Sequence, residues 1–144
     1  MAAAPKIRAF LDTDVLLDYL RGKPELQLLF SPEVEDRVSF AVNPVVLQEL
    51  LLASGAVDQP VDLNRLTKHL EIVGAEELPA PNILNHLREL RNRLAHANDL
   101  MILESSSHCD VLLTYNKALL ELGNIAEVES ETPEEFLNDL QLAS

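Results

Sequence analysis

Two aspartates follow the first apolar segment of the chain. Ile7 to Leu11 has the composition of a short buried strand, and Asp12 and Asp14 follow it on either side of Thr13. In parallel α/β sheets, ligands gather beyond the carboxyl ends of the strands, where these two carboxylates would lie. Helix capping is the structural alternative, because aspartate at a helix start accepts hydrogen bonds from free backbone N–H groups. Asp12 and Asp14 are therefore candidate site residues.

Glu49 is a carboxylate within an apolar helical stripe. The residues three and four positions away are Val45, Val46, Leu52 and Ala53, and this spacing predicts that Glu49 does not face bulk water. A buried carboxylate needs a cation, a hydrogen-bond donor or a shifted pKa. A metal ion and a buried ion pair with an arginine would each meet that need.

Two further oxygen donors occur late in the chain. Asp99 lies at the start of a predicted helix over about 98–106, with apolar residues one turn ahead of it, so we expect it to face inward. Asn116 follows a predicted strand over 109–114, at the mouth of the same sheet. Each could instead cap the helix that begins beside it.

Carboxylates that converge in this way would require a cation. Two of them about 4 Å apart repel by about 4 kcal/mol at an effective dielectric near 20. A ligand set made only of oxygen atoms favours Mg²⁺ or Mn²⁺ over zinc. Such an ion lowers the pKa of bound water and stabilises charge on a phosphodiester oxygen. The residue types therefore predict metal-dependent phosphodiester chemistry.

The elements that must position these residues alternate between strand and helix. The predicted strands cover 7–11, 38–42, 70–73, 109–114 and 125–128. The predicted helices cover 15–20, 24–29, 45–54, 62–69, 82–94, 98–106 and 117–122, and a last helix starts with a capping-box pattern at Thr132. This alternation predicts a mainly parallel central sheet covered on both faces, a three-layer α/β/α fold.

Composition limits the class of protein. A chain of 144 residues with 47% apolar content is expected to form a single domain, residues 1–144, with no membrane-spanning segment and no secretory signal. Cys109 is the one cysteine, so no disulfide within the chain is possible and a cytoplasmic location is expected. We expect Cys109 to be a buried apolar residue, and the four histidines lack the spacing of zinc ligands.

The net charge of −13 argues against simple nucleic-acid binding, which usually requires a basic surface. Arg88, Arg91 and Arg93, with His86 and His96 beside them, form the one cationic concentration in the sequence. A solvated helix face is the alternative interpretation of this cluster. Bound divalent metal or a basic partner would reduce the acidic charge.

Taken in order, the motifs resemble those of the PIN domain. They are Phe-Leu-Asp12-Thr-Asp14-Val, then Asn-Pro-Val-Val-Leu-Gln-Glu49-Leu, then Ala-Asn-Asp99, then Leu-Leu-Thr114-Tyr-Asn116. The similarity is greatest to the small stand-alone (VapC-like) PIN ribonucleases that act as toxins of toxin–antitoxin pairs, and it spans nearly the whole chain.

The resemblance implies a PIN-like fold and a function, an Mg²⁺- or Mn²⁺-dependent endoribonuclease. It implies Asp12, Glu49 and Asp99 as the acidic catalytic core, with Asp14 and Thr114 in support. It further implies an RNA substrate, a homodimer and a cognate antitoxin. The family has a fourth acidic position where this chain has Asn116, which leaves the number of metal ions open.

Two other functions fit parts of the pattern. A catalytically weak PIN-like protein-interaction module agrees with Asn116 and with the acidic charge. A haloacid-dehalogenase-like phosphatase is suggested by the Asp12-Thr13-Asp14 string, but glycine usually follows the second aspartate of that motif and here the residue is Val15.

Overall fold

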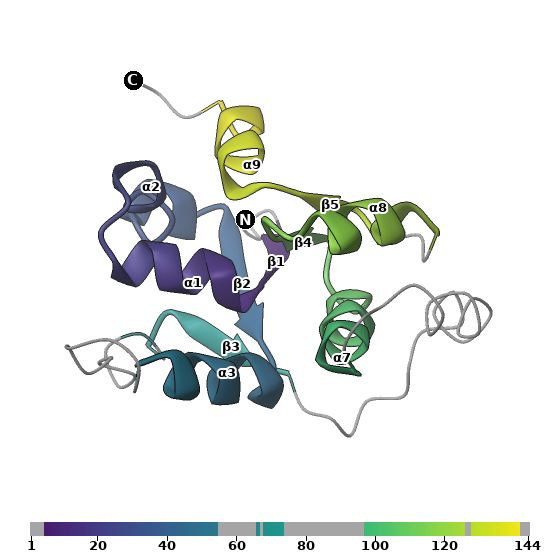
Figure 1. Ribbon diagram of the computed structural model, residues 1–144. Coiled ribbons are helices and arrows are strands. Elements are labelled where there is room, and N and C mark those ends of the chain that lie inside the picture. The colour runs from purple at the N-terminus through teal and green to yellow at the C-terminus, as the bar shows by residue number, and fades with distance from the viewer. Residues whose placement is uncertain (1–4, 55–65, 67, 74–96, 126–127, 142–144) are drawn as a thin grey trace.

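The computed structural model describes residues 5–54, 66, 68–73, 97–125 and 128–141. Within these residues, the strands form one five-stranded sheet in the order β3-β2-β1-β4-β5, and every pair of neighbours is parallel. The strands are β1 (Ile7–Leu11), β2 (Val38–Val42), β3 (Leu70–Ile72), β4 (Val111–Leu113) and β5 (Ser130–Glu131). The mainly parallel sheet that the sequence predicts is thus confirmed, and β1 lies at its centre (Figure 1).

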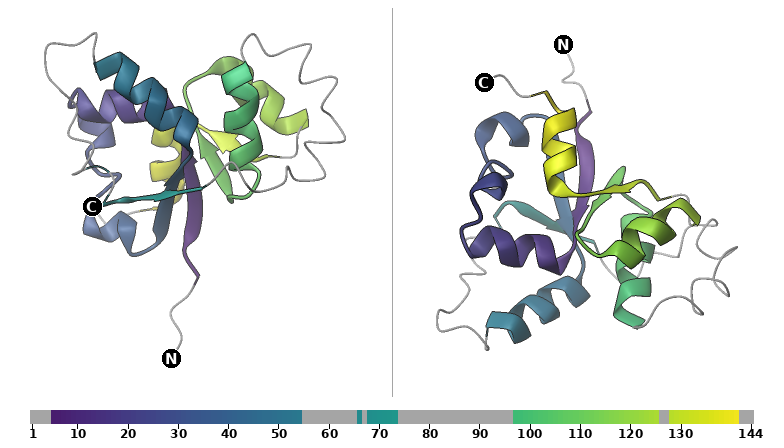
Figure 2. Two further views of the ribbon diagram at one scale, coloured as in Figure 1. Left: turned by 90° about the horizontal axis from the view of Figure 1, so that it is seen from below. Right: turned by 45° about the horizontal axis from the view of Figure 1, so that its top comes forward.

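Helices connect and cover the strands. They are α1 (Thr13–Leu20), the 3-10 helix η1 (Pro24–Leu26), α2 (Pro32–Glu35), α3 (Pro44–Ser54), α7 (Ala97–Ser106), α8 (Lys117–Ile125) and α9 (Pro133–Asp139). Figure 2 shows α1 and α9 to one side of β1 and β4, with α7 and α8 beyond the other. None of the helices in the described ranges is both long and apolar enough to cross a bilayer.

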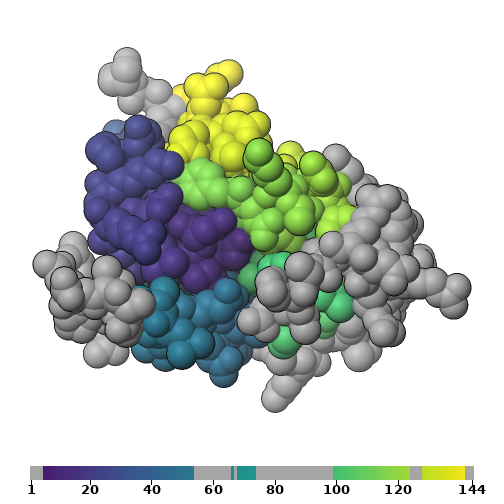
Figure 3. All heavy atoms as spheres, in the orientation of Figure 1, coloured from purple at the N-terminus to yellow at the C-terminus, as the bar shows by residue number. Residues whose placement is uncertain are grey.

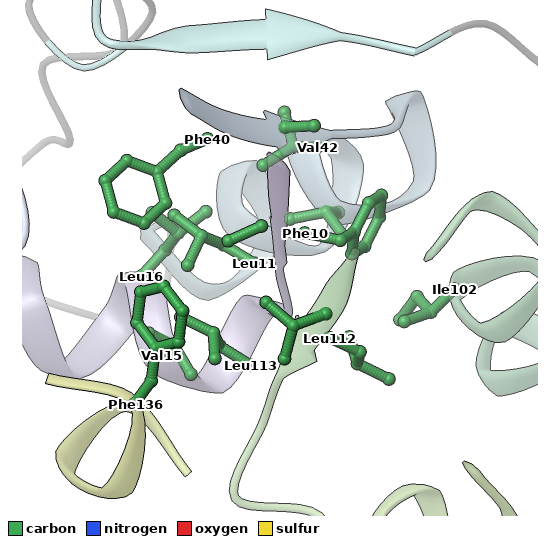
Figure 4. Close-up of a cluster of buried hydrophobic side chains, with 14 of the residues drawn as sticks. Phe10, Leu11, Val15, Leu16, Phe40, Val42, Ile102, Leu112, Leu113 and Phe136 are labelled. Carbon is green, nitrogen blue, oxygen red and sulfur yellow. The ribbon is translucent and has the colours of Figure 1, made fainter. Parts of the chain in front are cut away.

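The core lies on both faces of the sheet because side chains alternate along each strand. Leu11 and Leu113 are register partners that lie with Val15 and Phe136, whereas the neighbouring pair Phe10 and Leu112 points toward α7 (Figure 4). All are 4% exposed or less. Two helix layers therefore enclose the sheet, as expected for a three-layer α/β/α fold.

Local signals explain where the best-predicted helices begin and end. The Asn43 side chain accepts a hydrogen bond from Val46 N at 2.9 Å, which caps α3 as the Asn-Pro pair predicts. Helix α9 begins with the predicted capping box between Thr132 and Glu135. Helix α1 stops before Gly22, whose φ of +83° is the left-handed conformation that glycine adopts most readily.

Some predicted elements differ from the observed ones. The helix predicted over 24–29 is only the 3-10 helix η1, and α2, capped by the Ser31 side chain, was not predicted. The strand predicted over 109–114 is shortened to Val111–Leu113. The predicted helix 82–94, most of 62–69 and the loop at 55–61 lie outside the described residues.

The predicted strand over 125–128 is wrong at both of its ends, because α8 continues through Gly123 to Ile125 and Val128 is not in a strand; residues 126–127 lie outside the described residues. The observed strand β5 comes later, at Ser130–Glu131. Gly123 does not end the helix. A Cβ atom built there would collide with the Ser130 side chain and lie 2.7 Å from the Val128 carbonyl oxygen. Glycine at this position lets α8 lie against the chain that enters β5.

Candidate functional site

The first candidate, Asp12, lies at the carboxyl end of the central strand. Its backbone N–H extends the β1–β4 ladder by donating to Leu113 O at 3.1 Å, and its side chain caps α1 by accepting from Thr13 N at 2.7 Å. The second carboxylate oxygen accepts from Thr114 Oγ1 at 2.7 Å. Asp12 is only 6% exposed and Thr114 is fully buried, so this pair is fixed within the protein.

Burial is the main influence on the Asp12 carboxyl. It raises the pKa above the usual 3.8, the hydrogen bonds from Thr114 and Thr13 lower it, and the charge of Asp99 raises it further. The capping alternative for Asp12 is thus realised, yet capping alone does not explain the burial of a second carboxylate so close by. An ionised carboxylate keeps further lone pairs for a cation when each oxygen accepts one hydrogen bond.

That second carboxylate belongs to Asp14, in the first turn of α1. Its Oδ2 accepts a hydrogen bond from Tyr115 N at 3.2 Å. Its Oδ1 is buried and has no hydrogen-bond partner among the described residues, and the same holds for the neighbouring Thr13 hydroxyl. Burial, followed by the charge of Asp12, raises the pKa of Asp14 from 3.8 to about 7.

Glu49 lies in the middle of α3, on the edge of its buried face. Val46 and Leu50 are fully buried, and the Glu49 Oε1 atom is inaccessible to solvent. The apolar stripe that the sequence predicts is nevertheless incomplete, since Leu52 is 78% exposed. Glu49 is half-buried, and Val45 and Val46, one turn before it, are buried.

Asp99 is half-buried in the first turn of α7, where the buried residues Ile102 and Leu103 follow it as predicted. One residue links this helix to α3. The Asn43 amide that caps α3 donates to Ser105 Oγ at 2.9 Å and to Met101 O at 3.3 Å, both on α7. Asn43 therefore fixes the helix that carries Asp99 against the one that carries Glu49.

Asn116 caps the helix that follows it. Its Oδ1 accepts from Ala118 N at 2.9 Å and Leu119 N at 3.4 Å, at the start of α8. Its own N–H donates to Thr114 Oγ1 at 3.0 Å, and the same Thr114 hydroxyl donates to Asp12. The structure thus gives the Asn116 side chain the capping contact that the sequence left open.

The arrangement brings some of the candidates together electrostatically. The charge of Asp12 raises the pKa of Asp14, and the charge of Asp99 raises the pKa of Asp12. Figure 3 shows the surfaces of α1, α3 and α8, the three helices that follow β1, β2 and β4, meeting on one face. In the described part of the chain, His, Cys, Asp and Glu side chains form no group of three or more spaced to hold a metal ion.

The donor chemistry nevertheless fits a hard divalent cation. The available donors are oxygen atoms, one carboxylate oxygen is buried without a hydrogen bond in the described ranges, and neighbouring negative charges raise the pKa values of Asp12 and Asp14. A bound cation would relieve both conditions. The residues present are thus those that Mg²⁺ or Mn²⁺ would select.

Other sequence candidates lie elsewhere. The arginine cluster at 88–93, His86 and His96 fall outside the described residues. His69 Nδ1 lies 2.6 Å from Glu35 Oε1, and its ring stacks on Phe30. Neither contact involves a candidate site residue. Cys109 is half-buried at the edge of the core, less enclosed than predicted.

Tyr115 is the functional candidate that sequence reasoning missed. It makes its contact with Asp14 through the backbone, so its residue type carries no signal. Its position directly after Thr114, at the end of a strand beside β1, is the feature that could have indicated it.

Comparison with known proteins gives a structural relative. No family model and no curated protein matches this chain in sequence. Among solved structures, it is similar to VapBC2 from Rickettsia felis bound to a DNA fragment from their promoter. The match has a TM-score of 0.61 and 19% identity, and it covers 88% of this chain and 98% of that one. At this identity the similarity concerns the fold, and it agrees with the resemblance in the motifs: the chain has a PIN-like α/β fold.

Proposed function

We propose that this chain, residues 1–144 acting as one domain, is a divalent-metal-dependent endoribonuclease of the PIN type. Asp12, Glu49 and Asp99 are its acidic catalytic and metal-binding core, and Asp14 and Thr114 support them. One observation carries the proposal: at the carboxyl end of the central strand Asp12 is buried and Asp14 is half-buried, with Asp14 Oδ1 inaccessible to solvent and lacking a donor in the described residues. Removing two neighbouring carboxylates from water is unfavourable, and such pairs are typical of functional sites, where a bound ligand offsets the cost.

The residues around Asp12 have different roles in the proposed site. Thr13 N and Thr114 Oγ1 hold the two oxygens of Asp12 in one orientation, so this carboxylate is preorganised. Asp14 adds negative charge beside it, and Asp99 acts on Asp12 from α7. When bound, Mg²⁺ or Mn²⁺ would supply a water of lowered pKa and stabilise charge on a phosphodiester oxygen.

Asn116 enters the proposal mainly as the cap of α8. Using its Oδ1 as a fourth metal ligand would compete with the hydrogen bonds from Ala118 N and Leu119 N. A second ion would therefore bind more weakly than one held by a carboxylate at this position.

Partners follow from the acidic charge and the fold. A chain of net charge −13 approaches RNA only with metal bound or with basic residues facing the substrate. We propose a cognate antitoxin partner, which the structural similarity to VapBC2 supports, and we also propose that the chain forms a homodimer. The same similarity gives no support to the phosphatase alternative.

The test is Mn²⁺ binding by calorimetry together with cleavage of RNA by purified protein. Asp12→Asn and Asp99→Asn are expected to lose both, whereas Asp36→Asn, at an exposed carboxylate after α2, serves as the matched control. Undiminished cleavage by a double Asp12→Asn, Asp99→Asn variant would sink the assignment.

A protein-interaction module remains the second candidate. It is favoured by the cap that Asn116 makes and because the described residues contain no group of three or more His, Cys, Asp or Glu side chains that could hold a metal ion. The same calorimetry separates the two functions. Wild-type protein that folds and yet binds no Mn²⁺ would favour the module.

A further inference from the structure

The side chains of Lys23, Tyr115 and Glu134 form a network that joins three separate segments of the chain close to Asp14. Lys23 Nζ donates to the Tyr115 hydroxyl at 3.0 Å, and that hydroxyl donates to Glu134 Oε1. Lys23 Nζ also lies 3.0 Å from Glu134 Oε1 and 4.4 Å from the centre of the Tyr115 ring. Each of the three side chains contacts the other two.

The network is anchored at both ends by local structure. Lys23 follows Gly22, and its own N–H is fixed by Asp18 O at 3.0 Å. Glu134 lies in the first turn of α9, whose start is held by the capping box of Thr132 and Glu135. Tyr115 is thus held between two defined ends of helices.

Tyr115 in turn belongs to the segment that touches the carboxylates. We call residues 114–116 the acidic-edge turn. Thr114 Oγ1 donates to Asp12, Tyr115 N donates to Asp14, and Asn116 caps α8. Strand β4 ends at Leu113, and beyond it the sheet holds this turn through Thr114 N, which donates to Glu131 O at 3.1 Å.

We propose that Lys23, Tyr115 and Glu134 are positioning residues, a tether that holds the acidic-edge turn against Asp12 and Asp14. The inference rests on the proposed function, since it concerns the same carboxylates. Metal sites require their ligands to be held within about 0.5 Å. The hydrogen bond from Tyr115 N to Asp14 is 3.2 Å long, so a small shift of the turn would break it.

Surface ion pairs alone contribute little to stability, so a purely structural role for the network predicts almost no effect of its removal. The tether predicts a local effect at residue 115 and a loss of metal affinity. These two outcomes are measurable separately.

Tyr115→Phe is the central variant because it removes the hydroxyl while keeping the ring and the net charge. Tyr19→Phe is the matched control: the only other tyrosine is also half-buried, packs edge-on against Phe30, and its hydroxyl makes no hydrogen bond in the described part of the chain. Lys23→Met tests the direction in which Mn²⁺ affinity changes. Loss of a cation near the acidic edge would tighten Mn²⁺ binding by electrostatics alone, whereas loss of the tether would weaken it.

The first measurement is amide hydrogen exchange of the metal-free protein. We expect residue 115 to exchange on the order of tenfold faster in Tyr115→Phe than in wild type, as for loss of one hydrogen bond to a charged group, and Tyr19→Phe to leave it unchanged. Unchanged exchange at residue 115 in Tyr115→Phe would overturn the tether.

The second measurement is Mn²⁺ affinity by calorimetry. We expect Tyr115→Phe to weaken binding on the order of tenfold and Lys23→Met to weaken it as well. Faster exchange with unchanged affinity in Tyr115→Phe, or tighter binding by Lys23→Met, would overturn the positioning role. Absence of Mn²⁺ binding by wild-type protein contradicts the proposed function instead, and the exchange result then still decides whether the network holds the turn.

Discussion

Asparagine at position 14 should stabilise the metal-free protein at high pH. The pKa of Asp14 is 3.8 in the unfolded chain and is raised to about 7 in the folded chain. Between these values unfolding releases a proton, so stability is fully present below the lower pKa and falls as the pH rises toward the upper one. Asp14→Asn removes this titration and keeps an oxygen that can accept from Tyr115 N.

The size of the effect follows from the two pKa values. A rise from 3.8 to about 7 corresponds to about 4 kcal/mol, at about 1.4 kcal/mol for each pH unit. Asp14 is only half-buried, and solvent screening reduces this figure. We therefore expect Asp14→Asn to raise the free energy of unfolding by about 1 to 3 kcal/mol near pH 8, and to change it little near pH 4.

Urea denaturation in the presence of a chelator measures this difference. Asp36→Asn is the control for removal of an exposed carboxylate, and it should show no comparable gain. Added Mn²⁺ should stabilise wild type near pH 8 and stabilise Asp14→Asn less. Equal stability of Asp14→Asn and wild type at both pH values would contradict this prediction, because ionised Asp14 would then not destabilise the folded chain.

Three further changes test neighbouring contacts. Thr114→Val removes the donor to Asp12 and should lower the free energy of unfolding by about 1 to 3 kcal/mol in urea; a value near zero would show that the hydrogen bond is dispensable. Asn116→Asp keeps the helix cap and adds a carboxylate, so calorimetry should find Mn²⁺ bound on the order of tenfold more tightly, with Asn116→Ser as the uncharged capping control. Gly123→Ala should lower the melting temperature and cost about 1 to 3 kcal/mol because its Cβ would meet the Ser130 side chain; a higher melting temperature, as helix propensity alone predicts, would contradict this packing.

Elements marked by local chemistry were predictable from the sequence. Helix α3 begins at an Asn-Pro pair whose side chain makes the expected cap, and α9 begins with a complete capping box. Strand β1 is buried over its last three residues, as an apolar segment in the middle of a parallel sheet should be. In these elements the backbone preference and the tertiary position agree.

The last strand was not predictable, because tertiary contacts decide it. Residues 125–128 have a more strand-like composition than Ser130 and Glu131, yet Ile125 ends α8 and, among the described residues, Ser130 and Glu131 form β5. Its backbone is aligned by β4, where Leu112 N donates to Glu129 O at 2.8 Å and Thr114 N donates to Glu131 O. Gly123 looks like a helix end in the sequence, whereas its role is to permit close packing against Ser130.

At the candidate site, the sequence indicated which residues are involved, whereas their burial and hydrogen bonding became known only from the fold. Periodicity suggested that Glu49 faces inward, although Leu52 in the same stripe is exposed. No sequence pattern shows that Asp14 is left with a buried oxygen lacking a donor in the described residues, or that the Tyr115 backbone contacts it. Both depend on β4 lying beside β1, a contact between segments about a hundred residues apart.

The same burial links stability to ligand binding. Asp12 accepts one hydrogen bond on each carboxylate oxygen, from Thr13 N and Thr114 Oγ1. The backbone N–H groups of Tyr115 and Val15 lower the pKa of Asp14, yet its buried Oδ1 has no hydrogen bond in the described part of the chain. A site whose carboxylates were fully satisfied by the protein would gain little from a cation, because ligand binding would first have to replace those hydrogen bonds. The free energy that the metal-free fold loses when Asp14 ionises is therefore available to favour a bound cation, and the stability of the apo protein and its metal affinity should change in opposite directions when this carboxylate is replaced.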